Sequence, residues 1–294
     1  MSAIDEVKER ADIIEIVGET VKLRKTGKNY SGMCPFHPNT RTPAFAVFPD
    51  SQTWRCFGAC NEGGDVFSFL MKKEGWDFPE TLRYLAHRYG VELEPLTPER
   101  EEAEEEQQRL REVLEAAAAF FRHQLLNSPP GEHVMDYLKG RGLTEGTLEA
   151  FEVGYAPKSW DALHTHLAER EFAQEDILAS GVVSERDGGG YYDRFRHRIM
   201  IPIRDSRSRM VGFGARIVDP NDVPKYLNSP QTALFDKGRL LYGLDKARKA
   251  IRTMDNSVVV EGYMDVMGLH QAGFENAVSP MGTALSEYHI RTLK

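Results

Sequence analysis

The 294-residue sequence predicts an α/β fold, α+β overall, in which a small N-terminal unit precedes a larger body. Two patterns lead to this class. All three cysteines fall between Cys34 and Cys60, around a stretch that alternates like a β-hairpin. Further on, two short apolar runs at 257–260 and 276–279 flank a helical pattern, which is the order of a parallel strand–helix–strand unit. A glutamate-rich segment, 94–112, lies between the two parts and predicts a mobile joint at 94–100 that passes into a solvated helix.

Composition predicts a soluble protein with substantial cores, since 41% of residues are hydrophobic and 28% are charged. The N-terminus is amphipathic and acidic, so no signal peptide is expected. No apolar run approaches the ~18 residues of a membrane span. Three clustered cysteines argue against a disulfide framework. Together these features predict a cytoplasmic protein without membrane association.

The net charge of −8 conceals two segments of opposite sign. Residues 93–127 carry nine acids and four bases, whereas residues 190–252 carry fourteen bases and six acids. The overall pI of about 5.7 would argue against a nucleic-acid partner. The basic segment argues for one, with a solvated charged sheet face as the alternative.

Within the N-terminal unit, hydrophobic periodicity predicts helices at 5–17 and 78–89, and a helix at 66–71 capped by Asp65. A short strand is expected at 21–24. Strands at 44–48 and 53–57 should form a hairpin around the turn at 49–52.

The cysteines and one histidine form two close pairs, Cys34 with His37 and Cys56 with Cys60, separated by eighteen residues. This arrangement predicts one tetrahedral zinc ion, and a structural one because four protein ligands leave no open position. Buried core thiols and an ordinary loop histidine are the alternative. Trp54, beside the second pair, has two readings, as part of the ribbon core or as a nucleic-acid contact.

The larger body is predicted to hold helices at 110–126 and from 134 to 139, the latter ended by Gly140. A glycine turn at 188–190 precedes strands at 199–203 and 210–214. Three arginines alternate before the first of these strands, and if this segment is a strand they lie on one face as phosphate contacts. They are Arg194, Arg196 and Arg198.

Glu261 directly follows the run 257–260, which is predicted to be a short buried strand. Ligands of open α/β sheets sit beyond the carboxyl ends of strands, and a carboxylate there can hold Mg²⁺. An acid at a helix N-terminus is favoured by the dipole in any case, so the residues leave both interpretations open. Asp265 is more typical of a cap than of a ligand. A further helix is expected after 280–283.

Four segments in order resemble the bacterial DnaG-type DNA primases: CPFHPNTRTPAFAVFPDSQTWRCFGAC, RFRHRIMIPIRDSRSRMVGFGARI, PKYLNSPQTALFDKGRLLYG and VVVEGYMDVMGLHQAGFENAVSPMGTAL. The resemblance implies a DNA-directed RNA polymerase, a nucleotidyltransferase that makes RNA primers from ribonucleoside triphosphates on single-stranded DNA at the replication fork. It implies a zinc-ribbon template-binding domain at 1–93, an acidic linker and helix start at 94–112, and an N-terminal polymerase subdomain with a basic groove at 113–252. The remainder, 253–294, would be a partial Toprim subdomain.

The resemblance also assigns roles to single residues. Glu261 corresponds to the Toprim glutamate, a general acid/base or a holder of catalytic Mg²⁺ or Mn²⁺. The basic residues of the template and nucleotide groove correspond to Arg141, Arg216, Lys225 and Lys237. The residues in motifs that contact the incoming nucleotide are Tyr226, Asn228 and Tyr263.

The sequence departs from the family pattern in two ways. Ala59 is an extra residue between the second pair of zinc ligands, and the chain stops before an Asp-x-Asp strand that holds Mg²⁺ in the family and before its helicase-binding C-terminal domain. The expectation is weak Mg²⁺ binding and little polymerisation. The alternative to a primase function is a catalytically weak or inactive fragment that acts as a single-stranded DNA-binding module. A Toprim topoisomerase or nuclease is disfavoured because it would not explain the PKYLNSP segment.

Overall fold

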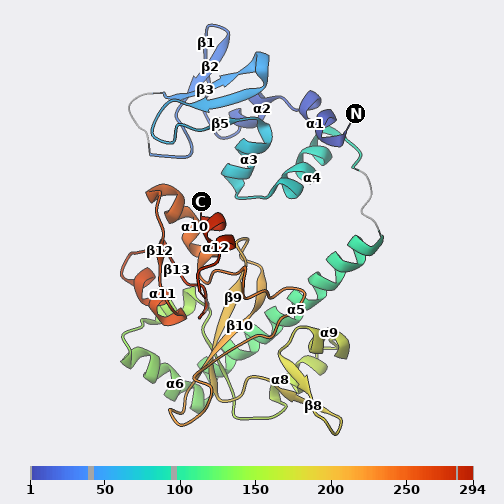
Figure 1. Ribbon diagram of the computed structural model, residues 1–294, viewed down its shortest axis with the longest axis vertical. Coiled ribbons are helices and arrows are strands. Elements are labelled where there is room, and N and C mark those ends of the chain that lie inside the picture. Colours follow the sequence, from blue (N-terminus) through green and yellow to red (C-terminus); the bar gives the residue numbers. More distant parts are fainter. Residues whose placement is uncertain (1, 39–42, 94–97, 283, 294) are drawn as a thin grey trace. The chain divides into compact units, whose positions relative to one another are not determined.

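The structure is a computed structural model that describes residues 2–38, 43–93, 98–282 and 284–293. The chain divides into two compact units, residues 1–97 and residues 98–294, each with its own hydrophobic cores. Both contain helices and strands, so the predicted mixed class is confirmed (Figure 1). None of the helices in the described part of the chain combines the length and the apolar character that a membrane span requires.

The first unit is built on a five-stranded antiparallel sheet whose strands follow chain order (Figure 1). They are β1 Arg24–Thr26, β2 Asn29–Gly32, β3 Phe45–Phe48, β4 Thr53–Cys56 and β5 Gly63–Gly64. The predicted β3–β4 hairpin is confirmed. The strand expected at 21–24 is wrong, because β1 begins only at Arg24. It pairs with β2 across a turn in which Gly27 takes a positive φ of 65°.

Four helices complete this unit: α1 Ala3–Arg10, α2 Ile13–Gly18, α3 Val66–Glu74 and α4 Phe78–Tyr89. The single helix expected at 5–17 is wrong. Asp12 has an extended backbone, and its carboxylate accepts a hydrogen bond from Ile14 N at 2.8 Å, which starts α2 as a separate helix. The predicted cap of α3 is confirmed, since Asp65 accepts from Ser68 N at 3.0 Å.

Trp54 belongs to the core of this unit. It is 2% exposed, and its ring stacks on Phe45 with centroids 5.2 Å apart. Its indole nitrogen donates to the carbonyl oxygen of Asp65 at 3.2 Å, so the buried N–H has a partner. Of the two readings of Trp54, the structure supports the ribbon core.

The second unit begins with α5 (Pro98–Asn127), a helix of 30 residues. Of the joint expected at 94–100, residues 94–97 lie outside the described residues and the rest form the first turn of α5. The helix is exposed up to Arg109 and buries one side from Leu110 onward. The predicted solvated start and apolar continuation are both seen.

A four-stranded antiparallel sheet lies at the centre of this unit, in the order β11–β10–β9–β6. Its strands are Tyr226–Asn228, Met210–Ile217, Arg198–Arg204 and Gly154–Ala156, respectively. Helix α5 packs on one face. On the other face pack α6 (Pro129–Gly140), α7 (Glu145–Ala150) and α11 (Tyr263–Gln271). Because both faces are covered, β9 and β10 are apolar along almost their whole length.

The segment before β9 differs from its prediction. Helices α8 (Ala162–Ala168) and α9 (Gln174–Ala179) lead to a hairpin of β7 (Val183–Glu185) and β8 (Tyr191–Asp193). The chain leaves β8 after Asp193, and His197 takes a φ of 49°. Arg194 and Arg196 therefore do not lie on a strand, and only Arg198 does, as the first residue of β9. Helix α6 begins at Pro129, whereas the sequence predicted a start at residue 134.

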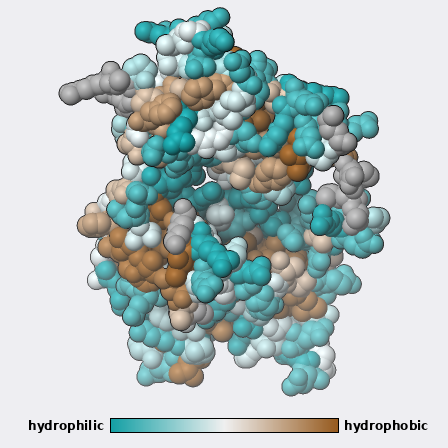
Figure 2. Space-filling model, turned by 45° about the horizontal axis from the view of Figure 1, so that its top comes forward, coloured by the Kyte–Doolittle hydropathy of each residue, from teal (hydrophilic) through white to brown (hydrophobic). Residues whose placement is uncertain are grey.

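The predicted parallel strand–helix–strand unit is confirmed as β12 (Val258–Val259), α11 and β13 (Ala277–Val278), with α10 (Leu244–Met254) before it. The expected burial of β12 is wrong, since Val259 is 40% exposed. Within the described residues β12 pairs with β13 alone. Figure 2 shows a hydrophobic patch on its left side, which is also the side where α10, α11, β12 and β13 lie in Figure 1. The helix expected next is α12 (Glu287–Leu293), and Thr283 lies outside the described residues.

Candidate functional site

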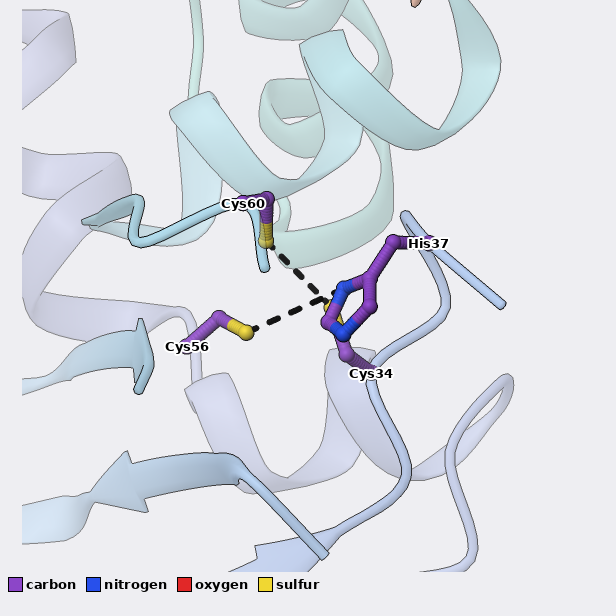
Figure 3. A group of neighbouring side chains, drawn as sticks. All are labelled: Cys34, His37, Cys56 and Cys60. Carbon is purple, nitrogen blue, oxygen red and sulfur yellow. Dashed lines mark hydrogen bonds between the residues drawn. The ribbon is translucent and has the colours of Figure 1, made fainter. Parts of the chain in front are cut away.

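The two predicted ligand pairs come together at one end of the first unit's sheet. The ligand atoms of Cys34, His37, Cys56 and Cys60 all lie within 4.8 Å of one another and point toward a common centre (Figure 3). The Sγ atoms of Cys34 and Cys60 are 3.6 Å apart, and Cys56 Sγ is 3.9 Å from His37 Nδ1.

These distances fit a tetrahedral zinc ion. With Zn–S bonds of about 2.3 Å and Zn–N bonds of about 2.0 Å, the edges of the tetrahedron measure about 3.5–3.8 Å. Gly58 N donates to Cys56 Sγ at 3.3 Å, and a Cβ on Gly58 would lie 3.0 Å from His37 Nε2, so a side chain there would crowd the histidine ligand. Burial raises the pKa of the Cys34 thiol to about 12, so a metal ion bound there displaces a proton.

The outward face of the same sheet carries an exposed aromatic residue next to a ligand. Phe57, which follows Cys56, is 64% exposed, and the Arg55 guanidinium lies 5.9 Å from the centre of its ring. Across the sheet, Arg55 is opposite Ala46, and Ala46 is opposite Ser31. Small side chains beside an aromatic and a cation leave a flat surface on which a base can stack.

In the second unit, the three predicted arginines converge on a pocket of about 550 Å³, here called the arginine pocket. Arg194 and Arg196 reach it from the segment after β8, and Arg198 from the start of β9. Other lining residues come from 158–160, which includes Trp160, and from the loop 219–224, which includes Asp219 and Asp222; His197 and Leu227 complete the lining. The structure brings the three arginines to one pocket, although Arg194 and Arg196 do not lie on a strand.

The arginine pocket combines desolvated cations with an exposed aromatic. Burial lowers the pKa of Arg194 and Arg198, and Arg194 Nε is buried without a hydrogen-bond partner. The unpartnered N–H of Arg194 gains from an anionic oxygen, whereas Arg198 already lies 3.8 Å from the Asp222 carboxylate and donates to the Pro224 carbonyl oxygen. The Arg196 guanidinium lies 4.1 Å from the centre of the Trp160 ring, which is 58% exposed on the surface. The pocket can therefore hold a phosphate and stack a base.

A second group of predicted residues gathers around the β10–β11 pair. Arg216 on β10 is opposite Tyr226 on β11, and Gly214 is opposite Asn228. The Tyr263 hydroxyl donates to Asn228 Oδ1 at 2.6 Å, and its ring lies 6.2 Å from that of Tyr226. A Cβ on Gly214 would lie 2.5 Å from the Tyr263 ring, so glycine lets the tyrosine cover the strand. Burial raises the pKa of Tyr263, so it stays a donor at neutral pH.

Arg141 joins this group through a residue that the sequence analysis did not single out. Tyr137 on α6 accepts hydrogen bonds from Arg141 Nη1, at 3.3 Å, and from Arg216 Nη1. We call these residues the tyrosine–arginine cluster: Tyr137, Arg141, Arg216, Tyr226, Asn228 and Tyr263. The signal that could have found Tyr137 is its position four residues before Arg141 on a helix.

The remaining predicted residues are less closely tied to this cluster. Lys225 precedes Tyr226, and its ammonium lies 6.0 Å from the Tyr226 ring. Lys237 lies in a turn after Phe235. Glu261 is exposed and lies just before Gly262, the N-cap of α11, so the expectation that Asp265 caps this helix is wrong. Among the described residues the cysteine–histidine group is the one metal-binding cluster of three or more ligands, so Glu261 is not within such a carboxylate group.

Trp160 was also missed by the sequence analysis. It lies in a polar segment without the apolar neighbours that a core tryptophan has, and this isolation was the available signal. Its position between the arginines became visible only in the fold, because 34 residues separate it from Arg194.

Family models match the chain in three consecutive parts. Residues 1–101 match the CHC2 zinc finger, residues 120–248 the N-terminal domain of the DNA primase catalytic core, and residues 255–294 the Toprim domain. The zinc-finger match and the ligand geometry together support zinc at the cysteine–histidine group.

Curated relatives that match over nearly the whole of this chain are named DNA primase. A DNA primase of Synechococcus elongatus is 47% identical over 98% of this chain and 42% of its own length, and one of Pseudomonas putida is 45% identical over 99% and 44%. The chain thus spans less than half the length of these relatives.

Solved structures of primase domains are also similar to this chain. The zinc-binding and RNA polymerase domains of the Aquifex aeolicus primase align with a TM-score of 0.59 at 35% identity, covering the whole of this chain and 70% of that one. A DnaG primase catalytic domain bound to single-stranded DNA aligns with a TM-score of 0.59 at 39% identity, over 64% of this chain and 58% of that one.

Proposed function

The chain belongs to the bacterial DnaG-type DNA primase family, and we propose that it takes part in DNA-directed synthesis of RNA primers, a nucleotidyl transfer. The observation that carries this proposal is the tyrosine–arginine cluster. It gathers two guanidinium groups with aromatic and amide side chains beside the strand end that bears Glu261. Primase relatives over the whole chain support the same function.

The arginine pocket is proposed to hold the single-stranded DNA template. Half-buried Arg194 and buried Arg198 bind phosphate oxygens, and Trp160 with Arg196 offers a stacking surface for a base. A related catalytic domain has been solved bound to single-stranded DNA, which supports this assignment. On the first unit, Phe57 and Arg55 are proposed as a second template contact.

The tyrosine–arginine cluster is proposed to bind the ribonucleoside triphosphate. Arg141 and Arg216 supply positive charge for the phosphates, while Tyr226, Asn228 and Tyr263 border the space for the base and sugar. Lys225 and Lys237 add positive charge to this groove. In this arrangement the chain's residues chiefly position the reacting groups and neutralise charge, which is most of what nucleotidyl transfer needs.

Glu261 is proposed as the catalytic carboxylate. Its exposed side chain at the end of β12 is free to hold a proton or a divalent ion, Mg²⁺ or Mn²⁺, that would neutralise phosphate charge when bound. The zinc ion is proposed to be structural, since four protein ligands fill its coordination sphere. Association with a replicative helicase remains a proposal for the longer family members.

Primer synthesis and DNA binding, measured side by side, test this function. The intact chain is incubated with a single-stranded template, labelled ribonucleotides and Mg²⁺, and products are separated by size while template binding is followed by fluorescence anisotropy. We expect a low yield of short RNA that depends on the template and is lost in Glu261→Gln, whose template binding stays unchanged. Failure of the wild type both to bind DNA and to make RNA would contradict the proposal.

A non-catalytic single-strand-binding function is the second candidate. The arginine pocket favours it, because that pocket is complete within the described residues and needs no divalent ion. Tight template binding without RNA synthesis, together with weak Mg²⁺ binding, would select this function over the first.

A further inference from the structure

Tyr137 connects two cations that come from different parts of the fold. Arg216 reaches it from β10, and Arg141 follows the end of α6. Both donate to the phenol oxygen, and both guanidinium carbons lie over the ring, 5.3 Å from its centre for Arg216 and 5.9 Å for Arg141. One aromatic side chain thus contacts both cations through its oxygen and through its π-face.

Two guanidinium groups at one oxygen repel each other, so something must hold them together. Within the described part of the chain neither arginine forms an ion pair with a carboxylate. A phenol accepts hydrogen bonds and attracts cations to its ring without cancelling their charge, whereas an aspartate or glutamate would neutralise it. The pair therefore keeps its full positive charge for an external anion.

Arg216 also retains a free donor. The residue is 8% exposed, and its Nε is buried without a hydrogen-bond partner in the structure. A buried guanidinium N–H without a partner is costly and gains from an acceptor oxygen. The two bonds from arginine also lower the pKa of Tyr137 although burial acts in the opposite direction, which indicates strong positive potential at this oxygen.

We propose that Tyr137 is the positioning residue of the nucleotide site, in that its phenol holds Arg141 and Arg216 side by side for two oxygens of a polyphosphate. The proposal rests on the proposed function of the tyrosine–arginine cluster. It separates two roles: the arginines contact the anion, and Tyr137 acts through them. The class of ligand is a linear polyphosphate, as found in a nucleoside triphosphate.

Inorganic triphosphate is the probe, and its affinity for the intact chain is measured by calorimetry. Tyr137→Phe keeps the ring but removes the acceptor oxygen, and we expect binding to weaken about tenfold. Tyr137→Leu removes the ring as well and should weaken binding further. The matched control is Tyr288→Phe, because Arg239 lies over the Tyr288 ring at 5.5 Å and this tyrosine lies outside the cluster. The control should bind like the wild type.

Two further readouts separate positioning from simple structural support. Arg141→Ala should cost less affinity in the Tyr137→Phe background than in the wild type, because the phenol that orients Arg141 is already gone. The phenolate absorbance that distinguishes wild type from Tyr137→Phe should shift to higher pH when triphosphate is saturating, since a bound anion opposes a second negative charge.

The possible outcomes distinguish the positioning role of Tyr137 from the proposed nucleotide site on which that role depends. If the wild type binds triphosphate and Tyr137→Phe binds it equally well, the positioning role is overturned while the nucleotide site stands. If the wild type does not bind triphosphate, the nucleotide site itself is wrong and the positioning role falls with it. A lowered melting temperature with unchanged affinity would mark Tyr137 as structural only.

Discussion

Arg196 and Arg198 line the same pocket in different environments. Arg198 is 5% exposed and donates to the Pro224 carbonyl oxygen at 2.8 Å, so a carboxylate at that position would be buried and would unfold its surroundings. Arg196 is half-buried, lies over the Trp160 ring and donates to the Asp193 carbonyl oxygen, so its replacement by alanine removes these contacts without burying an unpaired charge. Arg196 is therefore the residue whose substitution reports on DNA contact.

Arg196→Ala should weaken single-stranded DNA binding and make it less sensitive to salt. Loss of one phosphate contact lowers the slope of log affinity against log salt by about one. Anisotropy titrations over a range of salt concentrations measure the slope. The matched control is Arg170→Ala, an exposed arginine outside the pocket, which should leave the slope unchanged. An equal slope for wild type and Arg196→Ala would count against the phosphate contact.

At the scale of elements, α3 depends on the charge of its cap. Asp65 accepts from Ser68 N and pairs with Lys8 at 2.9 Å. Burial raises the pKa of Asp65, but these contacts outweigh it, so the pKa lies below its ordinary value of 3.8. A carboxyl with a depressed folded pKa stabilises the fold above its unfolded pKa, and this contribution is lost as pH falls through the folded value.

Asp65→Asn isolates that charge, because asparagine also caps helices. We expect the variant to be less stable than the wild type at pH 6, and the difference to shrink as pH falls below about 4. Urea unfolding followed by tryptophan fluorescence in a Trp160→Phe background, which leaves tryptophans only in the first unit, provides the measurement. A stability difference that is the same at pH 6 and at pH 2 would assign the effect to shape rather than to charge.

Zinc should stabilise the zinc ribbon, which comprises the two ligand turns and the β3–β4 hairpin between them. Cys34 and Cys56 are buried in the unit's core, and a zinc ion would add four ligand bonds that join their two turns. Removal of zinc with a chelator should increase backbone hydrogen exchange over about residues 30–62. The sheet of the second unit is the internal control and should keep its protection. Unchanged exchange at the ribbon would exclude a structural role for the ion.

Some helices and strands of this protein were predicted correctly from the sequence and others were not, for physical reasons. Strong periodicity and turn residues predicted β3, β4, α3 and α4 well. The break between α1 and α2 was missed because Asp12 reads as an ordinary polar position on a helix, and its capping role depends on its backbone conformation. The strand expected through Arg194 and Arg196 fails for a similar reason, since alternation alone cannot show that His197 adopts a positive φ.

In the whole molecule, the predicted site residues of the second unit separate into two places. The arginine pocket holds one set and the tyrosine–arginine cluster another. Arg216 pairs with Ile199 and Arg198 with Ile217, so the two arginines lie on neighbouring rungs of the β9–β10 ladder and their side chains point to opposite faces of the sheet. Residue types and resemblance could name both sets of cations. Tyr137 and Trp160 required the fold, because each meets its arginines across long stretches of sequence.

The central claim is that the arginine pocket holds single-stranded template, and photo-crosslinking tests it most directly. Oligonucleotides that carry 5-iododeoxyuridine are bound to the intact chain, irradiated and mapped by mass spectrometry. The account predicts crosslinks at Trp160 or at Tyr192, whose ring lies 6.0 Å from it, and their loss in excess unlabelled DNA. Crosslinks confined to residues that neither line the pocket nor contact Trp160 would contradict the account.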